Sequence, residues 1–158
     1  MKKEVVQKNP EKSASKVAIN SFMIASLFII LTLIFTLGLE KFSPSVIWEL
    51  VLAVPLLFVS SLAYAKVGYH KKHQLFDNFG WFASTLGNNF MLNVIGLMSA
   101  ISSKLLGFVY FGVLFFTIFI YYGIKTYYQP SQIKISILKL LFILIILILG
   151  GVYPLINL

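Results

Sequence analysis

The chain of 158 residues contains no cysteine, no arginine and few charged side chains. Without cysteine it has no disulfide, no thiol nucleophile and no zinc–thiolate or iron–sulfur site. Because all 13 basic residues are lysines, no guanidinium group is present to clamp a phosphate through two hydrogen bonds. Charged residues make up 11% of the chain, against about a quarter in a typical soluble domain. This composition excludes a soluble globular protein.

What the chain has instead is apolar sequence. Hydrophobic residues make up 59% of it, and the mean hydropathy is +0.90. Intrinsic disorder is excluded, since it requires low hydrophobicity and high charge. The net charge of +8 is better explained by lysines that flank membrane spans beside anionic lipid than by binding to nucleic acid. We therefore predict an integral membrane protein whose partners are lipid headgroups and other membrane proteins or copies of itself.

Five apolar segments predict an all-α bundle of five transmembrane helices in a single domain, residues 17–158. A helix of about 20 apolar residues crosses the hydrocarbon core of a bilayer, and the segments lack the alternation of barrel strands. They cover residues 17–39, 46–65, 81–101, 105–124 and 135–156. Residues 1–16 precede them as a lysine-rich tail, which we expect to be solvated and cytoplasmic. The alternative is four spans, with the third segment re-entrant.

Lysines near the ends of the segments predict the orientation, because cytoplasmic loops carry an excess of positive charge. With five spans and a cytoplasmic N-terminus in the cell membrane, 11 lysines lie inside, and Lys41 and Lys104 lie outside. The four-span alternative leaves nine inside and four outside. We expect lipid-headgroup contacts from the lysines that border the cytoplasmic ends of the spans, namely Lys66, Lys71, Lys72, Lys125, Lys134 and Lys139.

Small and polar residues within the spans predict which helix faces pack together, because membrane helices associate through close approach and hydrogen bonds. Such faces consist of Ala18, Ser21, Ala25, Thr32 and Thr36 in the first span, Glu49, Ala53 and Ser60 in the second, and Thr85, Asn89, Asn93, Gly96, Ala100 and Ser103 in the third. We expect these three faces to meet in the interior. The last two spans are more uniformly apolar and should lie at the periphery, facing lipid.

The side chains of Glu49, Asn89 and Asn93 are the candidates for a polar site inside the membrane. Glu49 is the only acidic residue within a span, and a carboxylate there indicates proton or cation handling. Counted from Trp81, Asn89 and Asn93 lie roughly 12 and 18 Å into the third span, so Asn93 and Glu49 can reach a similar depth. The alternatives are an interfacial glutamate stabilised by a helix N-terminus and asparagines that only hydrogen-bond between helices.

The loop before the third span holds a weaker candidate, His70, His73 and Asp77. Positions i, i+3 and i+7 share one face of a helix, so these side chains can converge on a metal ion. Lys71 and Lys72 flank the histidines and disfavour a bound cation, and Asp77 has a simpler role as the N-cap of the third helix. We therefore expect neither a metal nor another cofactor.

The sequence predicts no enzyme. No histidine lies within a span and Asp77 is the only aspartate, so intramembrane protease chemistry, aspartate-bound metals and haem ligation lack their residues. A long glycine-rich phosphate motif is also missing. We expect a small multi-pass protein that acts by helix packing, as an accessory, assembly or protective factor. The alternative is an ion or solute permease or channel, working as an oligomer, with Glu49, Asn89 and Asn93 along its path.

Overall fold

The computed structural model describes residues 10–67 and 73–158, and these residues form helices joined by short turns. The long helices of the described residues are α1 (Pro10–Leu37), α2 (Pro44–Val67), α3 (His73–Ser102), α4 (Lys104–Tyr128) and α5 (Ile133–Leu147). The turns are η1 (Leu39–Lys41) and η2 (Pro130–Gln132), and α5 continues through η3 (Ile148–Val152), a π-helical turn, into α6 (Tyr153–Asn157). The prediction of an all-α bundle is confirmed.

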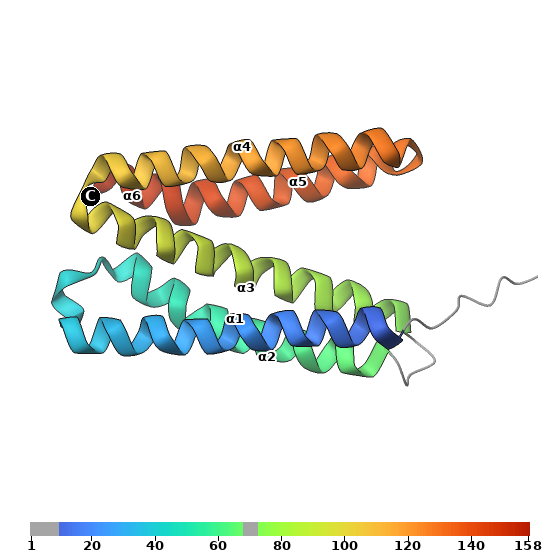
Figure 1. Cartoon of the computed structure of the whole chain (residues 1–158), viewed down its shortest axis with the longest axis horizontal. Helices are drawn as coiled ribbons and strands as arrows, with labels where there is room; N and C mark the ends of the chain where they lie inside the picture. The colour runs from blue at the N-terminus through green and yellow to red at the C-terminus, as the bar shows by residue number, and fades with distance from the viewer. Residues whose placement is uncertain (1–9, 68–72) are drawn as a thin grey trace, which may run out of the picture.

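The helices run alternately up and down, and α3 lies between the α1–α2 pair and the α4–α5 pair (Figure 1). The start of α1 and the α4–α5 connection lie at one end of the bundle, here called the amino end. The turn η1, the α3–α4 connection and α6 lie at the other, the carboxyl end (Figure 1). The most extensive packing is that of α2 on α3, followed by that of α1 on α2.

Four helical stretches in the described part of the chain are long and apolar enough to cross a membrane, and the chain is a membrane protein. These stretches are Ser13–Leu37, Pro44–Val67, Lys104–Tyr128 and Pro130–Asn157. The helix α3, with 30 residues, is long enough to cross a membrane. It is less apolar than the other four because asparagines, serines and glycines interrupt its apolar sequence. The predicted count of five apolar spans is therefore corrected: four helices qualify by composition, and α3 is a fifth, less apolar helix.

The re-entrant alternative for the third segment does not describe α3. This helix is continuous from His73 to Ser102 and follows the bundle from its amino end to its carboxyl end (Figure 1). At 1.5 Å per residue it is about 45 Å long, more than the ~30 Å of a hydrocarbon core. A re-entrant segment would reverse direction inside the membrane, and α3 has no reversal.

The first and third helices start earlier than predicted. Because α1 begins at Pro10, residues 10–16 of the expected tail are helical, and the hydroxyl of the buried Ser13 donates a hydrogen bond to the backbone oxygen of Tyr64. Because α3 begins at His73, Asp77 is not its N-cap. The Asp77 carboxylate instead accepts Lys16 Nζ at 2.6 Å, which pairs α1 with α3 at the amino end.

The predicted interior face of α1 is wrong. The five small and polar residues that suggested it are all exposed, namely Ala18, Ser21, Ala25, Thr32 and Thr36. The buried positions are Ser13, Asn20, Leu27 and Ile34, a spacing of seven residues that is typical of a seam between helices. Serine and threonine hydroxyls do not identify the buried face, because in a helix they can bond to the backbone oxygen one turn earlier. Thr32 bonds in this way to the backbone oxygen of Phe28 at 2.8 Å.

The predicted face of α2 is buried, and that of α3 is buried or half-buried apart from the exposed Ser103. The two faces do not meet along their length as predicted: Asn93 contacts Glu49, whereas Gly96 packs on Phe111 of α4, and Thr85 and Asn89 line a space shared with α4 and α5.

The helices α2 and α3 are in extensive contact. A hydrogen-bonded relay joins them to α1: Asn20 Nδ2 donates to Ser60 Oγ at 2.9 Å, and Ser60 Oγ donates to the backbone oxygen of Gly80 at 2.7 Å. Hydrogen bonds between membrane helices stabilise their association by about 0.6 kcal/mol on average. The helices α1, α2 and α3 therefore form one joined unit.

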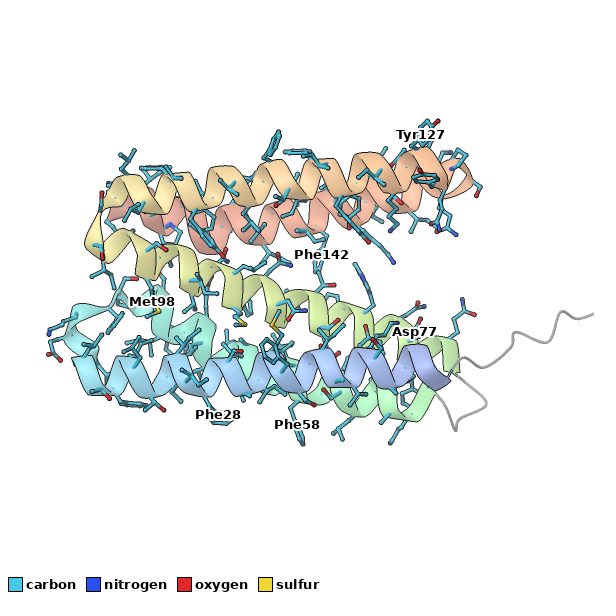
Figure 2. The ribbon with its side chains drawn as sticks, in the orientation of Figure 1. Phe28, Phe58, Asp77, Met98, Tyr127 and Phe142 are labelled. Atoms are coloured by element: carbon cyan, nitrogen blue, oxygen red, sulfur yellow. The ribbon has the colours of Figure 1, made fainter. Side chains whose placement is uncertain are left out.

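The helices α4 and α5 lie at the periphery, as predicted, but so does α1. In the 18-residue apolar stretch of each of these three candidate spans, only 17% is buried inside the bundle, against 39% for the corresponding stretch of α2. The rings of Phe28 on α1 and Phe58 on α2 point away from the bundle (Figure 2). The surface open to lipid therefore extends over both outer sides of the bundle.

Two single cysteines test whether α3 crosses the membrane, since the chain has no cysteine of its own. Gln74 lies in the first turn of α3 and Ser103 directly follows its last residue, and both are exposed. We expect only one of Gln74→Cys and Ser103→Cys to react with a membrane-impermeant maleimide in intact cells, and both to react after lysis. Reaction of both from the same side would mean that α3 does not cross.

Candidate functional site

A buried carboxylate and a buried amide meet where α2, α3 and the end of α5 come together. Asn93 Nδ2 donates to Glu49 Oε1 at 3.1 Å and to the backbone oxygen of Ile146 at 3.3 Å. Glu49 is 7% exposed and Asn93 is fully buried. We call Glu49, Asn93 and the adjoining Gly150 and Gly151 the carboxylate–amide cluster. The structure thus brings two of the three predicted site residues together.

Two glycines of the π-helical turn η3 make room for this cluster. A methyl group at Gly150 would overlap Glu49 Oε1 and Asn93 Nδ2, and one at Gly151 would come within 2.6 Å of Asn93 Oδ1. The backbone of η3 therefore approaches these polar groups more closely than any other residue type would permit. Such single π turns inside longer helices are frequent at functional sites. The sequence signal for this contact is the pair Gly150-Gly151 within an otherwise bulky apolar helix, and the predicted site did not include it.

Two oxygens of the cluster lack a hydrogen-bond donor among the described residues. These are Glu49 Oε2 and Asn93 Oδ1, and both are buried. A buried acceptor without a donor costs about 1–3 kcal/mol, so the cluster favours a proton on the carboxylate, a small donor or a cation. A single carboxylate beside an amide can hold a proton or a small cation. It provides no second acid or nucleophile for acid–base or covalent catalysis.

The third predicted site residue, Asn89, lies apart from the cluster. Asn89 Nδ2 donates to the backbone oxygen of Thr85 in its own helix at 2.7 Å. The residue lines a cavity of about 460 Å³ between α3, α4 and α5. Asn88 lines the same cavity, and the Oδ1 atoms of both asparagines are buried without a donor in the described part of the chain.

This polar-lined cavity lies nearer the amino end than the carboxylate–amide cluster, since Asn89 precedes Asn93 by one helical turn on α3. Its other polar lining residues are Thr85, Thr117, Tyr121 and Tyr122. Leu92 and Ile143 also line it, and they directly precede Asn93 on α3 and the turn of α5 that holds Ile146. A polar space and a buried carboxylate therefore follow one another along α3.

The geometry of the predicted metal site at His70, His73 and Asp77 is not described. His70 and its neighbours Lys71 and Lys72 lie outside the described residues, as does the side chain of His73. The remaining member of the site, Asp77, is paired with Lys16. Within residues 10–67 and 73–158, no three histidine, aspartate or glutamate side chains gather as they would around a metal ion.

The described members of the predicted headgroup lysines gather toward the amino end. Lys66 lies in the last turn of α2 and Lys125 in the last turn of α4, and their Nζ atoms lie 5.6 and 5.4 Å from the ring centroids of Phe76 and Tyr122. Lys139 Nζ lies 4.2 Å from the ring centroid of Trp81. Aromatic rings beside lysines suit the interface between hydrocarbon and headgroups, and their contact with lipid stays a prediction.

The fold and this cluster define a polytopic helical membrane protein with one buried carboxylate. No protein-family model, no curated protein and no solved structure matches the chain. Its function is therefore argued from its own residues.

Two glycine-to-alanine substitutions test the close approach at η3. Gly150→Ala forces a methyl group against Glu49 and Asn93 and should lower the free energy of unfolding by about 1–3 kcal/mol, the usual cost of overpacking. Gly112→Ala is the control, because nothing lies within 4 Å of the added methyl, and it should leave stability unchanged or raise it by about 1 kcal/mol. Denaturant titration in mixed micelles measures both, and equal effects would show that η3 is not closely packed.

Proposed function

We propose that the chain is a non-enzymatic protein of the cell membrane that acts by helix packing, as an accessory or protective factor for another membrane protein. The observation that carries this proposal is a face of α4 made of Gly112, Phe116, Phe119 and Gly123, here called the α4 face. Positions i, i+4, i+7 and i+11 lie on one side of a helix. Both glycines have open space where a Cβ would be.

The composition of the α4 face supports a helix partner from outside the chain. Phe116 is 66% and Phe119 is 53% exposed, so neither ring is used in the bundle. A glycine inside a helix costs about 1 kcal/mol relative to alanine, and Gly112 and Gly123 gain no contact in return within the described structure. Glycines in membrane helices let a second helix approach closely, with the two phenylalanines between them as contacts.

The polar side chains inside the bundle support a packing role rather than a catalytic one. Besides the Asn20–Ser60–Gly80 relay, Tyr64 Oη and Ser84 Oγ share a hydrogen bond of 3.2 Å between α2 and α3. These groups satisfy one another across helices and so hold the unit together, and they leave no nucleophile beside a base.

We also propose that the amino end faces the cytoplasm. The lysines whose helices place them toward this end are Lys16, Lys66, Lys125, Lys134 and Lys139, whereas Lys41 and Lys104 lie at the carboxyl end. An excess of lysine marks the cytoplasmic side. In the cysteine experiment described above, Ser103→Cys is then the variant that reacts from outside.

A photo-crosslinking residue at Phe116 tests the α4 face in the native membrane. We expect one discrete heavier band that is not a multiple of the 17.8 kDa chain, and we expect Gly112→Leu to remove it by filling the space that a partner helix needs. The same crosslinker at Phe28, exposed on α1, is the matched control and should give no such band. Equal bands from both positions would contradict the proposal, and a band at twice the chain mass would indicate self-association instead.

The second candidate is an oligomeric permease for a proton or a small cation. The specific observation in its favour is the cavity with the unpartnered Asn88 and Asn89 oxygens, one helical turn along α3 from Asn93, which bonds to the buried carboxylate of Glu49. Five long helices are few for a monomeric carrier, so this function would require several copies.

Flux through liposomes separates the two candidates. For the accessory role we expect no flux of protons, monovalent cations or small amines above that of protein-free vesicles. If flux appears, disappears in Glu49→Ala and persists in Glu40→Ala, the permease replaces the accessory role. Glu40 is the matched control because it is an exposed glutamate in the turn η1.

A further inference from the structure

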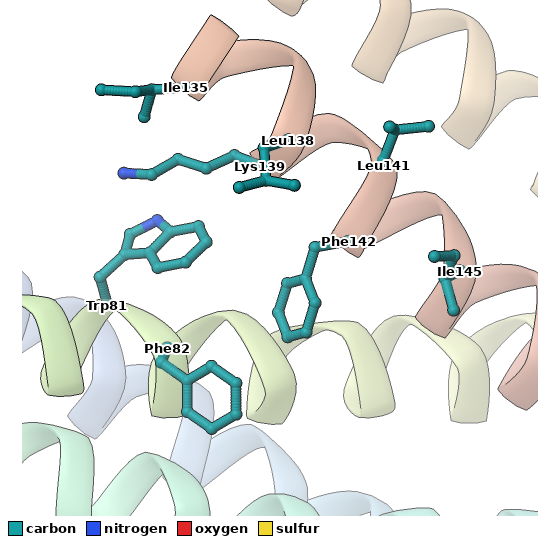
Figure 3. A pocket seen from close by; sticks show the side chains of 8 residues that line it. All are labelled: Trp81, Phe82, Ile135, Leu138, Lys139, Leu141, Phe142 and Ile145. Atoms are coloured by element: carbon teal, nitrogen blue, oxygen red, sulfur yellow. The ribbon is translucent and has the colours of Figure 1, made fainter.

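A cleft separates α3 from α5 in the half of the bundle nearest the amino end. Its volume is about 530 Å³, within the range of pockets that hold small ligands. The lining residues are apolar or aromatic with one exception, and they are Trp81, Phe82, Ile135, Leu138, Lys139, Leu141, Phe142 and Ile145 (Figure 3). The cleft opens sideways toward the bilayer, because Ile135, Leu138 and Leu141 are each at least half exposed.

The exception is Lys139, which places one positive charge in the cleft. Its side chain extends along the indole of Trp81 (Figure 3), with Nζ 4.2 Å from the ring centroid. Among the described residues, no carboxylate lies within ion-pair distance of Lys139; the charge of Asp77 acts on it from farther away, and Asp77 forms its ion pair with Lys16 at 2.6 Å. The ammonium group therefore lies at an apolar cleft without a direct ion pair among the described residues.

The rest of the cleft is suited to hydrocarbon. The ring centroid of Phe142 lies 5.6 Å from that of Phe82 and 6.2 Å from that of Trp81, so neighbouring rings, tilted against one another, form its inner wall. Ile145 continues this wall toward the carboxyl end (Figure 3). A transmembrane helix is about 10 Å wide with its side chains, too wide for a space of this volume, whereas an acyl chain is narrow and flexible.

We propose that this cleft binds one anionic phospholipid, with its phosphate at Lys139 and an acyl chain along Phe142 and Ile145. The charge at one end and the apolar wall beyond it match the two parts of such a molecule. Lys125 lies in the last turn of α4 and Lys134 in the first turn of α5, so the same end of the bundle adds positive potential that favours an anionic over a zwitterionic headgroup. This site is separate from the α4 face, and neither proposal requires the other.

Quenching of Trp81 fluorescence by brominated lipids tests the site. The chain has two tryptophans, so Trp48→Phe leaves Trp81 as the only emitter. In phosphatidylcholine vesicles, we expect brominated phosphatidylglycerol to quench Trp81 more than brominated phosphatidylcholine at equal mole fraction, with an apparent preference of about fivefold, the effect of one lysine near a membrane surface.

Charge variants identify the residue that causes the preference. Lys139→Gln should abolish the preference, so that the two brominated lipids quench Trp81 about equally. Lys139→Arg keeps the positive charge and should retain the preference. Lys134 lies at the same end of α5 but does not line the cleft, so Lys134→Gln should leave most of the preference for phosphatidylglycerol in place. Trp81→Phe, which reports from Trp48 on α2 (67% exposed), should show no preference.

Three results would overturn the proposal. The first is equal quenching of Trp81 by both lipids, and the second is a preference that survives Lys139→Gln in protein with unchanged helical circular dichroism. The third is loss of the preference when inorganic phosphate is added, which would mean that a free anion rather than a lipid occupies the cleft. Native mass spectrometry of the unmodified chain gives an independent readout, and we expect one phosphatidylglycerol to be retained. Failure of these tests leaves the crosslinking from the α4 face unaffected.

Discussion

Hydrocarbon offers no hydrogen bonds, and this constraint decides how the helices of this chain meet. A polar side chain inside a span must bond to its own helix or to a neighbour. Serines and threonines such as Ser21 and Thr32 bond to their own helix and face outward. Asparagines and the single intramembrane glutamate have donors and acceptors that one helix cannot satisfy, so Asn20 reaches Ser60 and Asn93 reaches Glu49. The interior of the bundle is therefore marked by amides, by the carboxylate and by the serines, among them Ser13, Ser60 and Ser84, whose hydroxyls bond to another helix.

The same constraint explains why the α4–α5 pair is attached unevenly. Toward the carboxyl end, glycines let α4 approach α3 closely: a methyl group at Gly96 would overlap Phe111, and one at Gly107 would approach the Cβ of Ala100 to 2.9 Å. Asn93 also bonds to the backbone oxygen of Ile146 there. Toward the amino end no described polar side chain of α5 bonds to α3, and the space between them holds the cleft and the polar-lined cavity. The α4–α5 pair is thus closely packed on α3 at the carboxyl end and separated from it at the amino end.

Length and hydropathy were enough to predict the class, the number of long helices and most of their boundaries, because these follow from the thickness of the membrane. The depth estimate also placed Glu49 and Asn93 close to each other. Sequence reasoning failed where a choice depended on a partner helix. The seam through Asn20 and Leu27 was hidden behind a more conspicuous row of small residues, and Asp77 was assigned to a helix start because its ion pair with Lys16 spans 61 positions of the chain. The contact of Gly150 with Glu49 requires the π-helical turn, which shifts the faces of the last helix and has no signal in hydrophobic periodicity.

The α4–α5 pair thus has two faces of different chemistry. Its outer face, with Gly112 and Gly123, is shaped for the flat approach of another helix, which needs small residues and no charge. Its inner face, with Lys139 above Phe142, combines one charge with hydrocarbon and suits a molecule that has both. A lipid held on the inner face would fill the space that the protein leaves open at the amino end and would support α5 where α3 does not. The position of α4, and with it the outer face offered to a partner, would then depend on the lipid as well as on the packing at the carboxyl end.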